Sequence, residues 1–503
     1  MVSIHQEVIL VIDVGTSFVK IGLFDKGANP LENHQIKFEH WMTIKSDGTY
    51  VFDAEESARI IERGIDELLS QTNNAFEIIS VATDTMASTI LALDKEGSPL
   101  TPVFTYADTR SYEHLSKLKK GVNQKKFYDE TGCPMHTSYI PSRILWFNDK
   151  CPELTSEVNI WTDFSNYLFR RWFKDSNIPI SYSVASWTGI LDRKRLCWHD
   201  SALKFIGLDK NQLPSLDPYT KNVSGLNSEY AKRWSILSDV PFFLPVGDGA
   251  SSNVGVGCNS GNKIALSIGT TGALRVLTDN LSVKIPQGLW AYRLGEQFSL
   301  LGGAFSEGGN VGLWLKRLMN IQVTTDNLTI NQSDSELENA LSRAKPDHHG
   351  LTVLPFLAGE RSIGWAENAT GTLSGIRLST TQTDIYQAFL EAIAYRFGLV
   401  SKRLLTVLSG DCYVIASGGA IQSSKYWLQM LSDVLGIQVG VSNVTEDTGK
   451  GTAILALEAL GIAKSINDFK FEISDIYEPD DKKMIIYQNA MNRQEELYSK
   501  IFT

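Results

Sequence analysis

The chain has 503 residues, of which 43% are hydrophobic and 21% are charged, a composition typical of a globular protein with more than one core. The formal net charge of −10 argues against a general surface for nucleic acid or for anionic membranes. The five cysteines are widely spaced and form no CxxC pair, so we expect neither a disulfide framework nor a zinc site, and a cytoplasmic location is the simplest prediction. Residues 1–14 lack the pattern of a signal peptide, and no run reaches the roughly 18 apolar residues that cross a bilayer.

Strand-like and helical patterns alternate along the first half of the chain, which predicts α/β layers. Residues 54–71 carry isoleucine and leucine side chains on one side of a helix, and Asp53 is placed to cap its N-terminus. Residues 133–240 are rich in Trp, Tyr and polar side chains and show no clear strand pairs, so we expect helices and loops that wall a pocket. Apolar runs predict strands at Val8–Val14, Ile21–Phe24, Ile79–Ala82 and Ile90–Leu93.

Strand character returns in the middle of the chain, at Phe242–Val246 and Lys263–Leu277. We expect the boundary between two lobes near Pro245, with residues 1–245 in the first lobe and 246–503 in the second. Residues 322–348 are polar and predict a surface excursion. The remaining predicted elements are helices at Gln382–Val407, Tyr426–Leu435 and Gly449–Leu460, and a strand at Cys412–Ala416.

One short motif occurs twice, half a chain apart. In each copy an apolar run meets a glycine-threonine turn, at residues 15–17 and 269–271, and a second apolar run follows. This pattern predicts two strands joined by a tight turn. Glycine lets the backbone approach a ligand, and consecutive N–H groups in such a turn form an anion-binding concavity. Two facing turns would hold a polyphosphate between two lobes, which indicates a phosphoryl-transfer enzyme.

Two aspartates accompany these turns. Asp13 precedes the first turn and interrupts an apolar run; a carboxylate beside a phosphate cradle can hold Mg²⁺, although it could also merely satisfy a turn. Asp248 lies between two glycines at the end of an apolar strand. A carboxylate in that position suits a general base for an alcohol, the alternative being a structural Asx-turn.

Other motifs are weaker or fail. Gly418 and Gly419 follow a predicted strand and precede a helix, an arrangement common in nucleotide sites. The segment from Glu446 to Thr452 lacks the first glycine of a P-loop, and no hydroxyl residue follows Lys450. The histidines show no HExxH spacing, and neither a GxSxG elbow nor a kinase-type HRD loop is present.

Together these segments resemble the FGGY carbohydrate kinases, a branch of the actin-like ATPase superfamily. The most specific element is Gly371–Ile376, followed after seven residues by Asp384–Glu391, which matches the family's C-terminal signature except that Phe389 replaces a smaller residue. Residues 83–88 and 105–111 look most like the gluconokinase group. The resemblance implies two actin-like (ribonuclease H-like) lobes with a deep cleft between them. It also implies transfer of the ATP γ-phosphoryl group, with Mg²⁺, to a hydroxyl of a sugar, sugar acid or polyol.

The resemblance assigns roles to particular residues. Asp248 would be the catalytic base and would touch the substrate, and Asp13 would be the carboxylate on the metal side. The residues that would bind ATP are Gly15, Thr16, Ser17, Gly269, Thr270, Thr271, Gly308, Gly309, Gly418, Gly419 and Ser423, with Gly302 and Gly303 bordering the nucleotide. The residues on the sugar side would be Asp84, Thr85, Met86, Asp108 and Arg110, although Arg110 could equally be a structural partner of Asp108.

Departures from the family leave the acceptor open. Ala87 follows Met86 where many members have histidine, and Asp84 adds a carboxylate that would repel a bound aldonate. Gluconate, ketoses such as xylulose or ribulose, and polyols all remain candidates. An actin-like ATPase that grips a protein and a non-catalytic sugar sensor are the alternatives of another class. The expected partner is a small-molecule sugar, sugar acid or polyol, without nucleic acid or membrane, and a homodimer is the default assembly.

Overall fold

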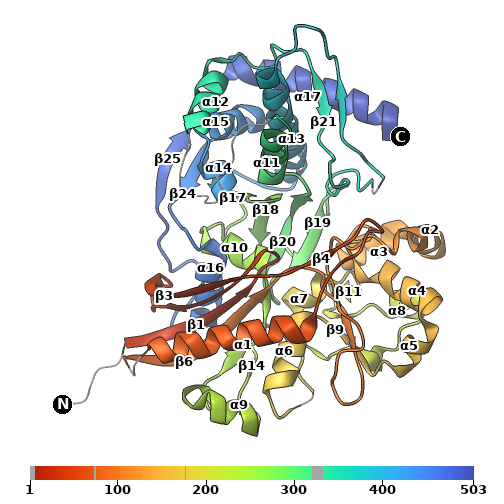
Figure 1. Cartoon of the computed structure of the whole chain (residues 1–503), viewed down its shortest axis with the longest axis vertical. Coiled ribbons are helices and arrows are strands. Elements are labelled where there is room, and N and C mark those ends of the chain that lie inside the picture. Colours follow the sequence, from red (N-terminus) through yellow and green to blue (C-terminus); the bar gives the residue numbers. More distant parts are fainter. Residues whose placement is uncertain (1–5, 73–74, 176, 320–331, 367, 503) are drawn as a thin grey trace.

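The computed structural model describes residues 6–72, 75–175, 177–319, 332–366 and 368–502. Two seven-stranded sheets stand in separate lobes, one above the other in Figure 1, with helices packed on their faces. This is the two-lobed α/β architecture that the alternating apolar patterns predict.

The first sheet has the strand order β14–β15–β6–β1–β2–β3, and β16 also pairs with β6. Its strands are β1 (Gln6–Val14), β2 (Phe18–Phe24), β3 (Pro30–Glu39), β6 (Phe76–Thr85), β14 (Asn222–Val223), β15 (Phe242–Phe243) and β16 (Val246–Gly247). Strand β1 pairs antiparallel with β2 and parallel with β6. Helix α1 (Ala54–Gln71) has the predicted bounds, and Asp53 caps it by accepting the Glu56 N–H at 2.7 Å. Its buried isoleucines and leucines pack against the strands.

The second sheet repeats this arrangement, with the order β19–β20–β18–β17–β23–β24–β25. Its strands are β17 (Lys263–Ile268), β18 (Gly272–Thr278), β19 (Trp290–Arg293), β20 (Ser299–Phe305), β23 (Tyr413–Ser417), β24 (Val439–Ser442) and β25 (Ile473–Tyr477). Strand β17 pairs antiparallel with β18 and parallel with β23, as β1 does with β2 and β6. The repeated motif of the sequence is therefore a repeated hairpin in space.

Further elements surround the first sheet and wall its edge. The helices are α2 (Tyr112–Gly121), α3 (Gln124–Thr131), α4 (Ile140–Lys150), α5 (Pro152–Glu157), α6 (Phe164–Trp172), α7 (Tyr182–Ser186), α8 (Asp200–Ile206) and α9 (Ser228–Arg233). Short strands pair among them: β4 (Thr43–Ile44), β5 (Tyr50–Phe52), β7 (Leu91–Leu93), β8 (Val103–Phe104), β9 (Ile160–Thr162), β10 (Ile180–Ser181), β11 (Leu191–Asp192), β12 (Cys197–Trp198) and β13 (Leu216–Asp217). The expectation that residues 133–240 lack strand pairs is wrong in this detail, because strands this short leave no alternating pattern in a sequence.

The second lobe carries the longest helix, α13 (Gln382–Leu405), which packs on β18 and β20. The other helices of the second half of the chain are α10 (Asp248–Gly255), α11 (Gly309–Leu318), α12 (Gln332–Arg343), α14 (Gly419–Gln422), α15 (Lys425–Leu435), α16 (Asp447–Ala459) and α17 (Asp481–Phe502). Strands β21 (Thr352–Leu354) and β22 (Thr372–Ser374) form a separate pair. The predicted excursion at 322–348 lies partly outside the described residues, and its described part is mostly the helix α12.

Helix α16 comes from the second half of the chain but packs on β1 and β6 of the first lobe, next to α10 (Figure 1). A Cβ atom on Gly255 would lie 1.7 Å from the Asp447 carbonyl oxygen, and one on Gly451 would lie 1.8 Å from that of Ser251. The backbones of α10 and α16 therefore touch, and this crossing joins the two lobes. Strand β16 belongs to the first sheet and β17 to the second, and the predicted boundary near Pro245 stays a prediction.

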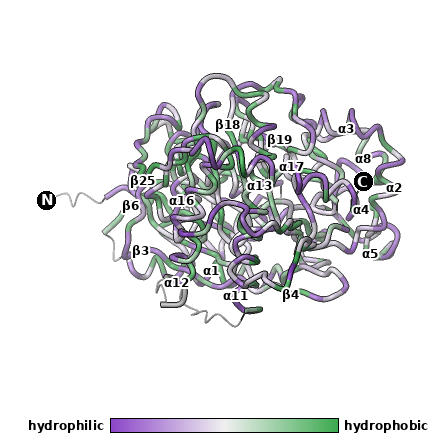
Figure 2. The backbone as a smooth tube through the Cα atoms, turned by 90° about the horizontal axis from the view of Figure 1, so that it is seen from above, coloured by the Kyte–Doolittle hydropathy of each residue, from purple (hydrophilic) through white to green (hydrophobic). Residues whose placement is uncertain are grey.

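Each lobe has its own apolar core. One core lies between α1, α6 and the first sheet, and the other lies between α13, α15 and the second sheet. Seen from above in Figure 2, hydrophobic stretches run through the middle of the molecule and hydrophilic stretches follow many outer turns. Among the described residues, no helix is both long enough and apolar enough to span a membrane.

Candidate active site

The first glycine turn connects β1 and β2. The Gly15 N–H donates to the Phe18 carbonyl at 3.1 Å and closes the turn. Thr16 is half-buried and Ser17 is exposed. Among the described residues, no acceptor binds the N–H groups of Thr16 and Ser17, so these donors are free to meet a ligand.

The second turn, between β17 and β18, is closed by a bond from the Gly269 N–H to the Thr271 carbonyl at 3.1 Å. The start of α11 supports it, since the Gly309 N–H donates to the Gly269 carbonyl at 2.9 Å. Gly308, Gly309 and Gly418 all pack against this turn, where a Cβ would lie 2.6–2.8 Å from main-chain or Ala420 atoms. By contrast, a Cβ on Gly269 or Gly419 would meet open space. Of the second-lobe glycines expected to bind ATP, Gly308, Gly309 and Gly418 therefore shape the turn. Gly269 and Gly419 leave room beside it.

The first turn of α16 connects the two hairpins. Glu446, which precedes the helix, accepts from Lys20 Nζ on β2 at 2.6 Å. Asp447 Oδ2 accepts from Ser417 Oγ at the end of β23 and from Ser252 Oγ on α10, both at 3.0 Å. Groups from both lobes therefore converge on the start of this one helix.

Asp13 and Asp84 are neighbours across the parallel strands β1 and β6. Asp84 is fully buried, and its Oδ2 accepts from Thr452 Oγ1 on α16 at 2.7 Å. Burial raises the pKa of Asp84 well above its ordinary value, and the nearby charge of Asp13 adds to the shift. Burial also raises the pKa of Asp13 to about 6, against the attraction of Lys20. Burial therefore opposes the ionisation of both carboxyl groups, most strongly that of Asp84.

Asp248 begins α10, directly after β16. It is half-buried, and its Oδ1 accepts the Gly249 N–H at 2.7 Å. Within the described part of the chain no group donates to its Oδ2, which leaves that oxygen for a substrate hydroxyl. Burial raises the pKa of Asp248, while Arg275 and Arg361 lower it. Strand β6 pairs with β1 at Asp13 and with β16 just before Asp248, and the charge of Asp248 reaches Asp13, so the predicted base and the predicted metal-side carboxylate lie near each other.

Three residues that the sequence did not single out act on Asp248, two through its flanking glycines and one through its charge. The ring of Trp187 packs on both flanking glycines: a Cβ on Gly247 would lie 2.8 Å from its Nε1. This Nε1 is buried and without a hydrogen-bond partner. Arg275 donates from Nη1 to the Gly249 carbonyl at 3.2 Å and from Nη2 to Ser267 Oγ at 2.6 Å. Neither Trp187 nor Arg275 belongs to a motif, so only the fold could reveal them.

The third is Arg361, in the segment after Gly359 of the second lobe. Its guanidinium lies 4.9 Å from the ring centre of Tyr106 in the first lobe, a cation–π contact. It makes no hydrogen bond or ion pair with any described residue, and its Nε is buried without a partner. A second contact between the lobes lies close by, since the rings of His136 and Trp365 meet edge-on at 5.1 Å. Arg361 is therefore a cation without an anionic partner among the described residues, and its charge lowers the pKa of Asp248.

Three other residues expected on the sugar side are buried, namely Thr85, Met86 and Asp108, and Arg110 is half-buried. Asp108 accepts the Tyr50 N–H at 3.0 Å and pairs with Arg110 at 2.7 Å. The geometry therefore favours the structural alternative for Arg110, and Asp108 has no oxygen left over for a sugar. Thr85 and Met86 are also buried, although the Thr85 hydroxyl lacks a partner.

Comparison with known proteins fits this geometry. The N-terminal domain model of the FGGY family of carbohydrate kinases matches residues 8–255, and the C-terminal domain model matches residues 264–460. The chain belongs to the FGGY family of carbohydrate kinases. It is 28% identical over 474 residues to a gluconokinase from Bacillus subtilis (strain 168), covering 93% of this chain and 90% of that protein.

Solved structures show the same fold for this FGGY kinase. A gluconate kinase from Lactobacillus acidophilus superposes with a TM-score of 0.88 at 23% identity, covering 99% of both chains. A xylulose kinase from the same organism gives a TM-score of 0.88 at 23% identity over 98% of both chains. The chain is therefore a sugar kinase, a phosphotransferase with an alcohol as acceptor, and kinases of this family use ATP, typically with a divalent metal.

The residues of this FGGY kinase fit Mg²⁺ and ATP. The charges of Asp248 and Glu446 raise the pKa of Asp13, and a divalent cation beside Asp13 would relieve that repulsion. The exposed turns carry the free N–H donors that phosphates need. Two glycines do not fit the expectation. Gly302 and Gly303 lie buried inside β20, where a Cβ would meet Leu274 and Val400, so they serve strand packing rather than the nucleotide. Ser423 is exposed just after α14.

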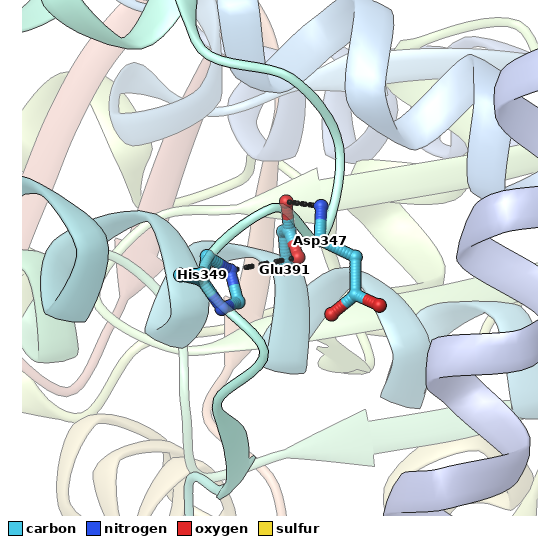
Figure 3. Close-up of side chains that lie close together, drawn as sticks. All are labelled: Asp347, His349 and Glu391. Atoms are coloured by element: carbon cyan, nitrogen blue, oxygen red, sulfur yellow. Dashed lines mark hydrogen bonds and ion pairs between the residues drawn. The ribbon is translucent and has the colours of Figure 1, made fainter. Parts of the chain in front are cut away.

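A separate cluster of possible metal ligands lies away from this site. Asp347, His349 and Glu391 bring ligand atoms within 4.8 Å of one another (Figure 3). Each atom already has a partner, however. Glu391 accepts from His349 at 3.2 Å and from the Asp347 N–H at 3.1 Å. Arg493 donates to both oxygens of Asp347. The positive charge of Arg493 therefore neutralises Asp347, as a metal ion would. The cluster also connects the loop before β21 to α13.

Proposed function

We propose that this kinase transfers the γ-phosphoryl group of Mg-ATP to a hydroxyl of a sugar acid, with gluconate as the first candidate. The observation that carries the proposal is the guanidinium of Arg361, which has no anionic partner among the described residues and whose charge lowers the pKa of Asp248, the proposed base. A general base would act on the hydroxyl, and the cation would hold the carboxylate of the same molecule.

The chain's own groups suit the reaction. Asp248 Oδ2 accepts the proton of the attacking hydroxyl as the bond to phosphorus forms. The N–H groups of residues 16–17 and 270–271 donate to phosphate oxygens, where preorganised donors stabilise charge that develops during transfer. Asp13 would hold Mg²⁺, which supplies neutralisation of the phosphate charges when bound. Trp187 offers its free Nε1–H to a second hydroxyl of the sugar.

The position of Asp84 removes one objection to an acidic substrate. Its carboxyl group is buried and accepts from Thr452, and burial raises its pKa well above the ordinary value. Burial therefore disfavours the charge on Asp84 that would repel a sugar acid. Arg361 instead supplies a positive charge on the sugar side, which a neutral ketose or polyol would leave without a partner.

The test is a coupled assay with Mg-ATP and gluconate, xylulose, ribulose and glycerol in parallel. We expect the highest kcat/KM with gluconate. Faster turnover of xylulose or ribulose would instead assign the ketose alternative. ATP hydrolysis that ignores every sugar would point to an actin-like ATPase, and binding of gluconate without turnover would point to a sensor. We place the enzyme in the cytoplasm, where ATP is available and where its five free cysteines would stay reduced.

A further inference from the structure

His40 follows β3 and holds the first glycine turn from behind. Its side chain is buried, and its Nδ1 lies 2.9 Å from the carbonyl oxygen of Gly15. Its backbone N–H donates to the carbonyl of Ser17, also at 2.9 Å. One residue thus binds two carbonyl groups of the turn.

The partners of the ring fix its tautomer. The Gly15 carbonyl can only accept, so Nδ1 carries the hydrogen. The other nitrogen, Nε2, then accepts from Ser57 Oγ on α1 at 3.0 Å. The ring also packs edge-on against Phe52, with centroids 4.5 Å apart, and burial lowers the pKa of His40. The imidazole is therefore neutral, oriented on both sides and unable to swing away.

In the second lobe, main-chain N–H groups bind the carbonyl groups of the glycine turn. There the Gly269 carbonyl accepts the Gly309 N–H at 2.9 Å, and the Thr270 carbonyl accepts the Asn310 N–H at 3.1 Å. Among the described residues of the first lobe, no helix N–H group donates to the carbonyl oxygens of Gly15 or Ser17, and His40 binds both of them instead.

A fixed carbonyl also fixes the next N–H group. The peptide unit is planar and trans, so its C=O and N–H point in opposite directions. When His40 draws the Gly15 carbonyl back into the lobe, the Thr16 N–H must point outward. No described group accepts that N–H.

We propose that His40 is a positioning residue that orients the Thr16 N–H toward the phosphates of the bound nucleotide. This inference rests on the proposed function, since it needs the turn to bind Mg-ATP or Mg-ADP. His40 touches neither the nucleotide nor the sugar, and it acts only through the peptide between Gly15 and Thr16.

The test uses a matched pair of substitutions. In His40→Asn the side-chain amide can occupy the place of Nδ1 and still donate to Gly15. In His40→Gln the amide reaches the place of Nε2 instead and loses Gly15. Ser57→Ala is the structural control, because it removes the contact of Nε2 and leaves the bond to Gly15. Titration calorimetry with Mg-ADP gives the affinity of each purified variant, and thermal denaturation without nucleotide gives its stability.

We expect His40→Gln to weaken Mg-ADP binding about tenfold, the cost of one charge-assisted hydrogen bond, and to raise KM for ATP but not for the sugar. His40→Asn should restore most of that loss. Ser57→Ala should lower the melting temperature without changing the affinity.

The inference is overturned if wild type binds Mg-ADP and the Gln and Asn variants bind it equally well. It is also overturned if the affinities of all three variants simply follow their melting temperatures. Failure of the wild-type protein to bind Mg-ADP would overturn the proposed function together with it.

Discussion

Replacing Asp248 with Asn tests the base directly, because it changes little else. The Asn side chain keeps the size of Asp and can still accept the Gly249 N–H through its Oδ1. The turn that begins α10 should survive, and the packing of Trp187 on the neighbouring glycines should remain. The Asn side chain, however, lacks the carboxylate oxygen of Asp248 that would accept the proton of the substrate hydroxyl.

The expected loss follows from this role. Proton transfer to a positioned base contributes about 10²- to 10⁴-fold to a rate, so kcat should fall by that factor. Binding should change in the other direction. Asp248 is a half-buried carboxylate whose pKa is lowered by Arg275 and Arg361, and neutralising it removes a repulsion felt by an anionic sugar acid. The Kd for gluconate should therefore stay equal or decrease.

The assay pairs steady-state kinetics with calorimetry on the same protein preparation. Equal melting temperatures for the two proteins serve as the control for folding. A kcat within about tenfold of wild type, below the range expected of a general base, would refute the assignment of Asp248. A large increase in Kd for gluconate would show that the hydrogen bond from the substrate hydroxyl to Asp248 outweighs the repulsion between the two carboxylates, contrary to this expectation.

Three further outcomes are expected. Arg361→Met should raise KM for gluconate by about 10- to 100-fold; because Arg361 lowers the pKa of Asp248, the acid limb of the kcat/KM profile should also move to higher pH. Gly269→Ala should keep the melting temperature but raise KM for ATP, whereas Gly308→Ala, with its Cβ 2.7 Å from Thr271, should lower the unfolding free energy in urea by about 1–3 kcal/mol. Glu391→Ala should cost about 3 kcal/mol or more in the same measurement, while EDTA should leave the wild-type melting temperature unchanged if no metal occupies that cluster.

Local patterns were enough to predict much of the fold. Helix α1 shows an apolar stripe and a capping Asp53, and both hairpins show glycines between apolar runs, so the neighbouring residues alone determine these elements. The predicted strand at Val8–Val14 is confirmed as part of β1, and the one at Cys412–Ala416 is confirmed except at Cys412, because β23 begins at Tyr413. Signals of this kind depend on spacing within one element, and the fold of the rest of the chain does not change them.

The parts of the site that the sequence did not reveal depend on distant contacts. Asp84 looks like a sugar ligand next to Met86, but parallel pairing places it beside Asp13, and α16 then covers it with Thr452. Arg361 looks like one more charged residue until the fold brings it against Tyr106. The residues next to Asp84 and Arg361 in the chain do not determine which distant residues these two contact. Their roles could therefore not be predicted from the spacing of motifs.

The crossing of α10 and α16 explains why the chemistry gathers where it does. Asp248 begins α10, and Glu446 and Asp447 mark the start of α16. The two backbones touch at Gly255 and Gly451, so neither helix can shift far without moving the other. The base, the groups at the start of α16 and the hairpins that it connects are therefore held together by one contact between two helix backbones.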